Sequence, residues 1–145
     1  MEKILCITND FGPRAGGIET FVIGLIERLP QSRVIVYTSA QDNSEPYDRK
    51  WLADYGVEVV RDKAKILLPT PGVAYCIKDL VREREISTVF FGAAAPLGLL
   101  SRGLRKVGVN HIVALTHGHE VWWSKVWPFT LAMKFISRQV NHLTY

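Results

Sequence analysis

Long uninterrupted hydrophobic runs are missing from this chain of 145 residues. A membrane-spanning helix needs roughly 18 to 20 consecutive apolar residues. The longest candidate, ISTVFFGAAAPLGLL, is shorter and is broken by Gly92, Pro96 and Gly98. The first residues, MEKILCITND, also lack the basic, apolar and small-residue order of a secretory signal peptide. We therefore expect a cytoplasmic protein.

Cysteine is scarce, and positive charge exceeds negative charge only slightly. Cys6 and Cys76 show neither a metal-ligand spacing nor a disulfide framework, so we predict that both are buried, reduced thiols. The formal net charge of +4 favours anionic partners, but it is modest and looks spread out. No aromatic RNA-binding signature or recognition-helix pattern accompanies it, so we predict no nucleic-acid partner.

Short apolar runs recur along the chain and are nearly continuous instead of alternating with polar residues. This pattern is typical of strands that are buried on both faces of a parallel sheet. Five such strands are predicted, and HLTY near residue 142 predicts a sixth. The five cover Ile4 to Thr8, Arg33 to Thr38, Val57 to Val60, Thr88 to Ala93 and His111 to Thr116.

Helical patterns separate these strands. Ile18 to Leu29 carries an apolar stripe, and the other four predicted helices begin at or just after a proline, which suits a first helical turn. The four cover Pro46 to Asp54, Pro71 to Arg84, Pro96 to Lys106 and Pro128 to Gln139. Alternating strands and helices predict an α/β fold with one Rossmann-like, doubly wound parallel sheet. Ligands are then expected at the carboxyl ends of the strands.

A glycine pair stands between the first predicted strand and the first predicted helix. Gly16 and Gly17 would let a ligand approach the backbone, and a helix start presents free N–H groups and a positive dipole end, which together suit an anion. A simple capping turn explains the same dipeptide equally well. The spacing matches neither the G-x-G-x-x-G dinucleotide fingerprint nor a P-loop, which disfavours dehydrogenases and P-loop enzymes.

A second polar cluster, LTHGHEVWW, follows the fifth predicted strand. His117, His119 and Glu120 form H-x-H-E, which is not the helical H-E-x-x-H of a zinc site, and we predict no bound metal. A histidine at a strand end is often only a hydrogen-bonded packing residue. The presence of the cluster and the glycine pair on the same expected edge of the sheet favours a functional interpretation.

These motifs together resemble the N-terminal domain of glycosyltransferase family 4, the retaining GT-B enzymes. The resemblance is carried by TNDFGPRAGGIETFV, GAAAPLGLL and THGHEVWW, and it covers essentially the whole chain. Within that family the chain is most similar to GDP-mannose-dependent phosphatidylinositol mannosyltransferases. The resemblance implies transfer of a hexose, mannose from GDP-mannose, to a lipid of phosphatidylinositol mannoside type. It implies no cofactor, because the nucleotide-sugar is a substrate.

The resemblance also implies roles for the named residues. Gly16 and Gly17 match the loop that approaches the diphosphate of the nucleotide-sugar through backbone amides. His117 matches the histidine that hydrogen-bonds the transferred sugar, without a covalent nucleophile on this domain. His119 and Glu120 are assigned to the same donor site, where they either touch the ligand or brace the loop. These assignments account for the glycine pair at the strand-helix junction.

The region of the last helix mixes aromatic and basic residues, a composition that suits an acidic membrane surface. The alternative is that the aromatic residues form core or inter-domain contacts. A lipid acceptor implies peripheral contact with the inner membrane face. The residues concerned are Trp122, Trp123, Trp127 and Phe129 with Lys125, Lys134 and Arg138.

A GT-B enzyme has two Rossmann-like domains, and this sequence matches the first, acceptor-side domain over residues 1–145. We expect a truncated GT-B fold without the C-terminal donor-binding domain, active as an enzyme only when joined to or paired with that domain. The alternative is a non-catalytic remnant or interaction module with a Rossmann-like core. A third interpretation, an unrelated phosphate-binding α/β protein, depends on fold alone.

Overall fold

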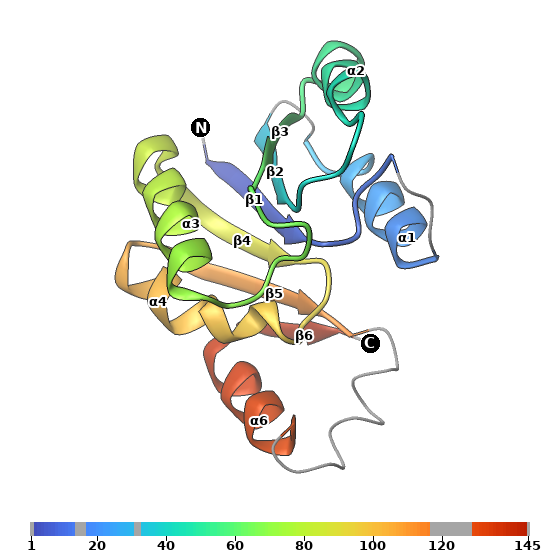
Figure 1. Cartoon of the computed structure of the whole chain (residues 1–145). Coiled ribbons are helices and arrows are strands. Elements are labelled where there is room, and N and C mark those ends of the chain that lie inside the picture. The colour runs from blue at the N-terminus through green and yellow to red at the C-terminus, as the bar shows by residue number, and fades with distance from the viewer. Residues whose placement is uncertain (1, 14–16, 31–32, 117–128, 145) are drawn as a thin grey trace.

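A computed structural model describes residues 2–13, 17–30, 33–116 and 129–144. Six strands form a single parallel sheet in the order β3-β2-β1-β4-β5-β6, which confirms the predicted doubly wound α/β fold (Figure 1). The strands are β1 (Lys3–Thr8), β2 (Val34–Thr38), β3 (Glu58–Arg61), β4 (Ile86–Phe91), β5 (His111–Leu115) and β6 (His142–Thr144).

The helices cover both faces of this sheet, as Figure 1 shows. Helices α1 and α2 lie on one face, and α3, α4 and α6 lie on the other. Their bounds are α1 (Gly17–Ile26), α2 (Glu45–Tyr55), α3 (Pro71–Arg84), α4 (Ser101–Lys106) and α6 (Phe129–Gln139), with a short 3-10 helix η2 (Leu97–Leu100) before α4.

Alternate residues of each central strand pack into two separate hydrophobic cores, one on each face of the sheet. Leu5 and Ile7 of β1 face α3, α4 and α6, where Ile77 is fully buried. Cys6 points to the other face and belongs to the core under α1 and α2, which includes Val22. Burial on both faces explains why these strands read as continuous apolar runs.

Most predicted elements differ from the observed ones by three residues or fewer. The helix predicted from Pro96 to Lys106 is wrong in its first half, which forms a turn and then η2 before α4 begins. Gly98 lies so close to α6 that an added Cβ would be 2.9 Å from Ile136 Cγ2. The Ser101 hydroxyl donates to the Gly98 carbonyl at 2.6 Å. A side chain that binds this carbonyl competes with regular α-helical bonding.

The predicted burial is confirmed for Cys6 and wrong for Cys76. Both thiols are free, but Cys76 is exposed. On α3 the buried stripe is formed by Val73, Ile77, Leu80 and Val81, and Cys76 lies at its margin. Helical periodicity indicated that α3 has a buried side without deciding where that side ends.

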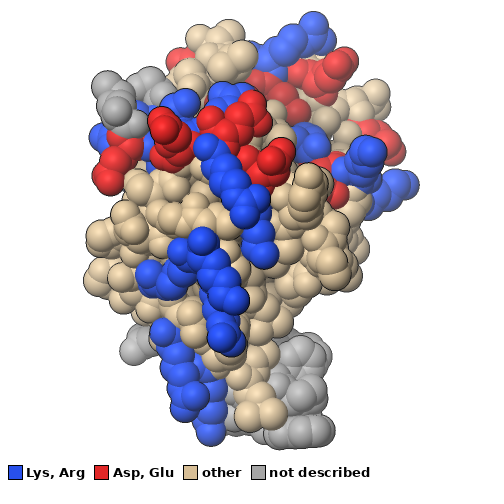
Figure 2. All heavy atoms as spheres, turned by 90° about the vertical axis from the view of Figure 1, so that its left-hand side faces the viewer, with Lys and Arg blue, Asp and Glu red and all other residues tan. Residues whose placement is uncertain are grey.

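The positive charge is also less evenly spread than predicted. Residues 86–145 contain six lysines and arginines and one acid, Glu120, so the excess lies wholly in this part of the chain. Figure 2 shows the side at which the strands begin, and lysines and arginines gather without acids on its lower part, where α4 and α6 lie. Arg105 has a structural role there, since it donates to the Gln139 carbonyl at 2.7 Å and to Asn141 Oδ1 at 2.5 Å.

Candidate functional site

The sheet reverses its strand order between β1 and β4. From β1 the chain proceeds outward to β2 and β3, and from β4 it proceeds in the opposite direction to β5 and β6. The loops after β1 and β4 therefore diverge to opposite faces of the sheet. Such a point, at the carboxyl ends of the strands, is where open α/β sheets bind ligands.

The two predicted motifs follow β1, which borders this point, and β5, which lies on the far side of β4. Gly17 is the first residue of α1, directly after the glycine loop, and β5 ends at Leu115, two residues before His117. β1 and β5 are both neighbours of β4, so their axes are about 10 Å apart. Gly16, His117, His119 and Glu120 lie outside the described residues, so their predicted roles stay predictions.

The ends of β1, β4 and β5 are tightly joined. The Ala94 amide donates to the Leu115 carbonyl at 2.7 Å, and the Gly92 amide donates to the Ile7 carbonyl at 3.0 Å. A Cβ added at Gly92 would lie 2.6 Å from Thr8 Oγ1, so only glycine fits there without displacing a neighbour. This glycine opens the GAAAPLGLL motif, and its role is close packing of β4 against β1.

The segment that leads into the glycine loop is anchored by aromatic packing. Phe11 is 1% exposed, and its ring lies 5.5 Å from that of Tyr47 and 5.3 Å from that of Trp51, both on α2. A Cβ added at Gly12 would be only 2.4 Å from the Tyr47 ring. Burial raises the pKa of the Tyr47 hydroxyl, so this group is neutral at physiological pH.

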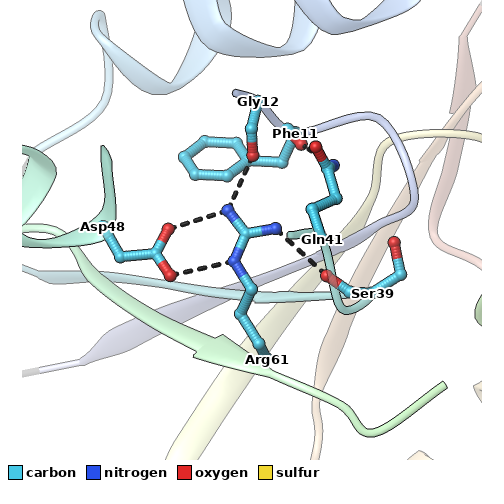
Figure 3. Close-up of polar contacts among 6 residues, drawn as sticks. All are labelled: Phe11, Gly12, Ser39, Gln41, Asp48 and Arg61. Carbon is cyan, nitrogen blue, oxygen red and sulfur yellow. Dashed lines mark hydrogen bonds and ion pairs between the residues drawn. The ribbon is translucent and has the colours of Figure 1, made fainter. Parts of the chain in front are cut away.

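Polar side chains hold the same segment from its other side, as Figure 3 shows. Arg61, the last residue of β3, donates through Nη2 to the Gly12 carbonyl at 2.6 Å and through Nη1 to the Ser39 carbonyl at 3.0 Å. Its Nε and Nη2 also form a two-point ion pair with Asp48 of α2, at 2.9 and 2.7 Å. Gln41 Nε2 donates to the Phe11 carbonyl at 2.6 Å. We call Arg61, Asp48, Gln41 and the two carbonyls of Phe11 and Gly12 the loop clamp.

A second anchor ties the end of β1 to the loop between β3 and α3. Asn9 Nδ2 donates to the Leu67 carbonyl at 3.0 Å, and the Leu67 amide donates to Asn9 Oδ1 at 2.6 Å. Leu67 is fully buried, whereas its neighbours Ile66 and Leu68 are 66% and 49% exposed. Asn9 therefore fixes an exposed apolar loop beside the carboxyl end of the central strand.

Glu19 lies in the first turn of α1. The residue is half-buried, and one carboxylate oxygen has no hydrogen-bond partner among the described residues. A negative charge at this position is favoured by the positive end of the helix dipole. Glu19 also helps to raise the pKa of Tyr47, although burial is the larger cause.

No protein-family model matches this chain. Curated relatives do match it over nearly its whole length. One from Corynebacterium glutamicum, a GDP-mannose-dependent monoacylated alpha-(1-6)-phosphatidylinositol monomannoside mannosyltransferase, is 38% identical over 143 residues, which are 99% of this chain and 37% of the relative. One from Mycolicibacterium smegmatis, a GDP-mannose-dependent alpha-(1-6)-phosphatidylinositol monomannoside mannosyltransferase, is 41% identical over 143 residues, 98% of this chain and 37% of the relative.

This chain is a homologue of these mannosyltransferases. A third relative with the same function, from Mycobacterium tuberculosis, is 41% identical over 127 residues, 86% of this chain and 33% of the relative. The predicted resemblance to GDP-mannose-dependent phosphatidylinositol mannosyltransferases is confirmed. The chain spans 37% of the length of the first two relatives, so it corresponds to a part of such an enzyme.

Sequence reasoning missed the loop clamp entirely. Arg61 closes a short apolar run, EVVR, and an arginine at that place looks like an ordinary solvated charge. One signal was available, because an arginine that ends a strand at the ligand-binding edge can reach the loops that follow the neighbouring strands. Among the described residues, no group of three potential metal ligands occurs, and no helix is long and apolar enough to cross a membrane.

Proposed function

We propose that this chain forms the acceptor-side domain of a retaining mannosyltransferase that moves mannose from GDP-mannose to a lipid of phosphatidylinositol mannoside type. The observation that carries the proposal is the similarity of nearly the whole chain to the GDP-mannose-dependent mannosyltransferases. The strand order supports it, because the loops of β1 and β5 leave the sheet on either side of β4, where such folds bind ligands. The required partner is a C-terminal donor-binding domain, supplied in the same chain or by another.

Each motif then has a chemical task. Gly16 and Gly17, at the start of α1, bring backbone N–H groups and the positive end of the helix dipole to the donor diphosphate. His117 hydrogen-bonds the transferred mannose and holds it for attack by the acceptor hydroxyl on the face that the leaving GDP occupies. His119 and Glu120 complete the same loop. No residue of this domain forms a covalent intermediate.

A mannose-transfer assay tests the proposal. The chain, joined to or mixed with a donor-binding domain, is incubated with GDP-mannose and a phosphatidylinositol mannoside, and UDP-glucose serves as the control donor. We expect labelled mannose in the lipid fraction from GDP-mannose only. His117→Ala should lower the rate by at least about a hundredfold, as expected for lost transition-state contacts. An undiminished rate would remove His117 from the mechanism.

Peripheral contact with an acidic membrane is the second part of the proposal. The loop between β3 and α3 carries exposed Ile66 and Leu68, with exposed Lys63 and Lys65 beside them. Apolar tips with flanking cations suit an anionic lipid surface. Asn9 holds this loop next to the end of β1, so a lipid headgroup at the surface would be close to the glycine loop.

Cosedimentation with vesicles tests this contact. Vesicles with about a third phosphatidylinositol in phosphatidylcholine are mixed with the protein and with a variant that carries Ile66→Asp and Leu68→Asp. Loss of two apolar contacts with the bilayer and the two added negative charges should weaken binding at least about tenfold. The control is Leu52→Asp on α2, an equally exposed apolar residue, at 55%, that lies over the opposite face of the sheet. Equal weakening in both variants would argue against a specific loop contact.

A further inference from the structure

We propose that Arg61 is a positioning residue for the nucleotide-sugar, acting through the main chain that leads into the glycine loop. The inference rests on the proposed function, which assigns the donor diphosphate to the loop before α1. Arg61 lies on the edge strand β3, two strands from β1, yet its guanidinium reaches the Gly12 carbonyl at 2.6 Å. It thereby connects the outer part of the sheet to the ligand-binding loop.

The contacts of Arg61 come from three separate segments. They are the Gly12 carbonyl after β1, the Ser39 carbonyl after β2, and the Asp48 carboxylate on α2 (Figure 3). Four of the five N–H donors that a guanidinium carries are used in these bonds. The side chains of Arg61 and Asp48 are only 11% and 20% exposed. With its donors directed at protein atoms, Arg61 acts on the loop and not on the substrate.

The clamp leaves the start of the loop little freedom. Arg61 holds the Gly12 carbonyl, Gln41 holds the Phe11 carbonyl at 2.6 Å, and the Tyr47 ring fills the space where a Cβ of residue 12 would be. Five residues after Gly12, α1 begins at Gly17. Backbone amides that bind a diphosphate must be held within a fraction of an ångström of their working positions. A fixed Gly12 therefore limits how far the first amides of α1 can move.

Lysine cannot replace arginine in this arrangement. Its ammonium is a single point with three donors, and it cannot span a carboxylate in two-point fashion while also reaching two carbonyls on other segments. Arg61→Lys keeps the charge and most of the buried stem, so the change is confined to the geometry of the clamp.

The chain provides a matched control. Arg84 forms a similar two-point pair with Glu58, with Nη1 to Oε2 at 2.8 Å and Nη2 to Oε1 at 2.7 Å. Glu58 begins the same strand that Arg61 ends, so this pair lies where the strands begin, away from their carboxyl ends. Arg84→Lys makes the same chemical change at the other end of β3, away from Gly12.

Steady-state kinetics of the transferase assembled with its donor-binding domain test the inference. Arg61→Lys should raise KM for GDP-mannose about tenfold, the usual order of effect when charge-assisted hydrogen bonds that place a binding group are lost. KM for the lipid acceptor should stay unchanged, and kcat should change less than about threefold. Arg84→Lys should leave all three values unchanged. An equal change in both KM values, or none, would overturn the positioning role.

Amide hydrogen exchange of this chain separates the inference from the proposed function. The peptide that covers residues 11–18 should exchange faster in Arg61→Lys than in the parent, and at the parental rate in Arg84→Lys. Peptides from β1 and β4 should be unchanged in both. Unchanged exchange in residues 11–18 would refute the clamp even if transfer is observed. If the parent transfers no mannose, the proposed function fails, and exchange alone decides whether Arg61 fixes the loop.

Discussion

Replacement of Gly92 by alanine should destabilise the fold at the switch point of the sheet. A Cβ at this position would lie 2.6 Å from Thr8 Oγ1, 2.8 Å from Thr8 Cβ and 3.3 Å from Val22 Cγ2. Thr8 is fully buried and Thr8 Cβ is next to the backbone, so the neighbour cannot move aside by rotation of a flexible end. The ends of β1 and β4 would have to move apart, and α1 would have to shift away from Gly92.

Overpacking of this kind costs about 1–3 kcal/mol of unfolding free energy. For a domain of this size the midpoint of thermal unfolding should fall by about 2–12 °C. The assay is urea and thermal unfolding followed by circular dichroism, with Gly72→Ala as the control. No atom lies within 4 Å of a Cβ at Gly72, in the first turn of α3, so that variant should be neutral or slightly more stable. Equal stability of Gly92→Ala and the parent would refute the close-approach argument.

Three further predictions concern single side chains. Burial raises the pKa of the Cys6 thiol, so an aromatic disulfide reagent at pH 8 should react only with the exposed Cys76 in the folded protein and with both thiols in guanidinium chloride. Rapid reaction of both thiols without denaturant would contradict this prediction. Asn9→Asp removes the donor to the Leu67 carbonyl and should lower the free energy of unfolding in urea by about 1–3 kcal/mol and also weaken vesicle binding. Unchanged vesicle binding would show that Asn9 does not position the loop between β3 and α3 for lipid contact. Thr70→Ala removes the N-cap of α3 and should cost about 1 kcal/mol by the same urea assay, with no change in vesicle binding.

The strands and most helices could be predicted from local sequence because their signals are local. Continuous apolar runs indicate strands buried on both faces, and prolines at helix starts gave the bounds of α3 without error. The region from Pro96 to Ser101 was not predictable in this way. Its 3-10 form accompanies the close contact of Gly98 with Ile136 on α6, a residue far away in the chain. The exposure of Cys76 also depends on how α3 sits on the sheet.

The order of elements, the fold class, the two motifs and the resemblance to mannosyltransferases can all be derived from the amino-acid sequence. Each depends on residues that are neighbours in the chain or on a recognisable pattern. What surrounds the segment that leads into the glycine loop follows only from tertiary contacts. Arg61 meets Asp48, Ser39 and Gly12 across separations of 13, 22 and 49 residues. No local pattern relates such positions. They come together because parallel pairing brings the carboxyl ends of β1, β2 and β3 to one edge, where the guanidinium at the end of β3 can reach the loops after β1 and β2 and also α2.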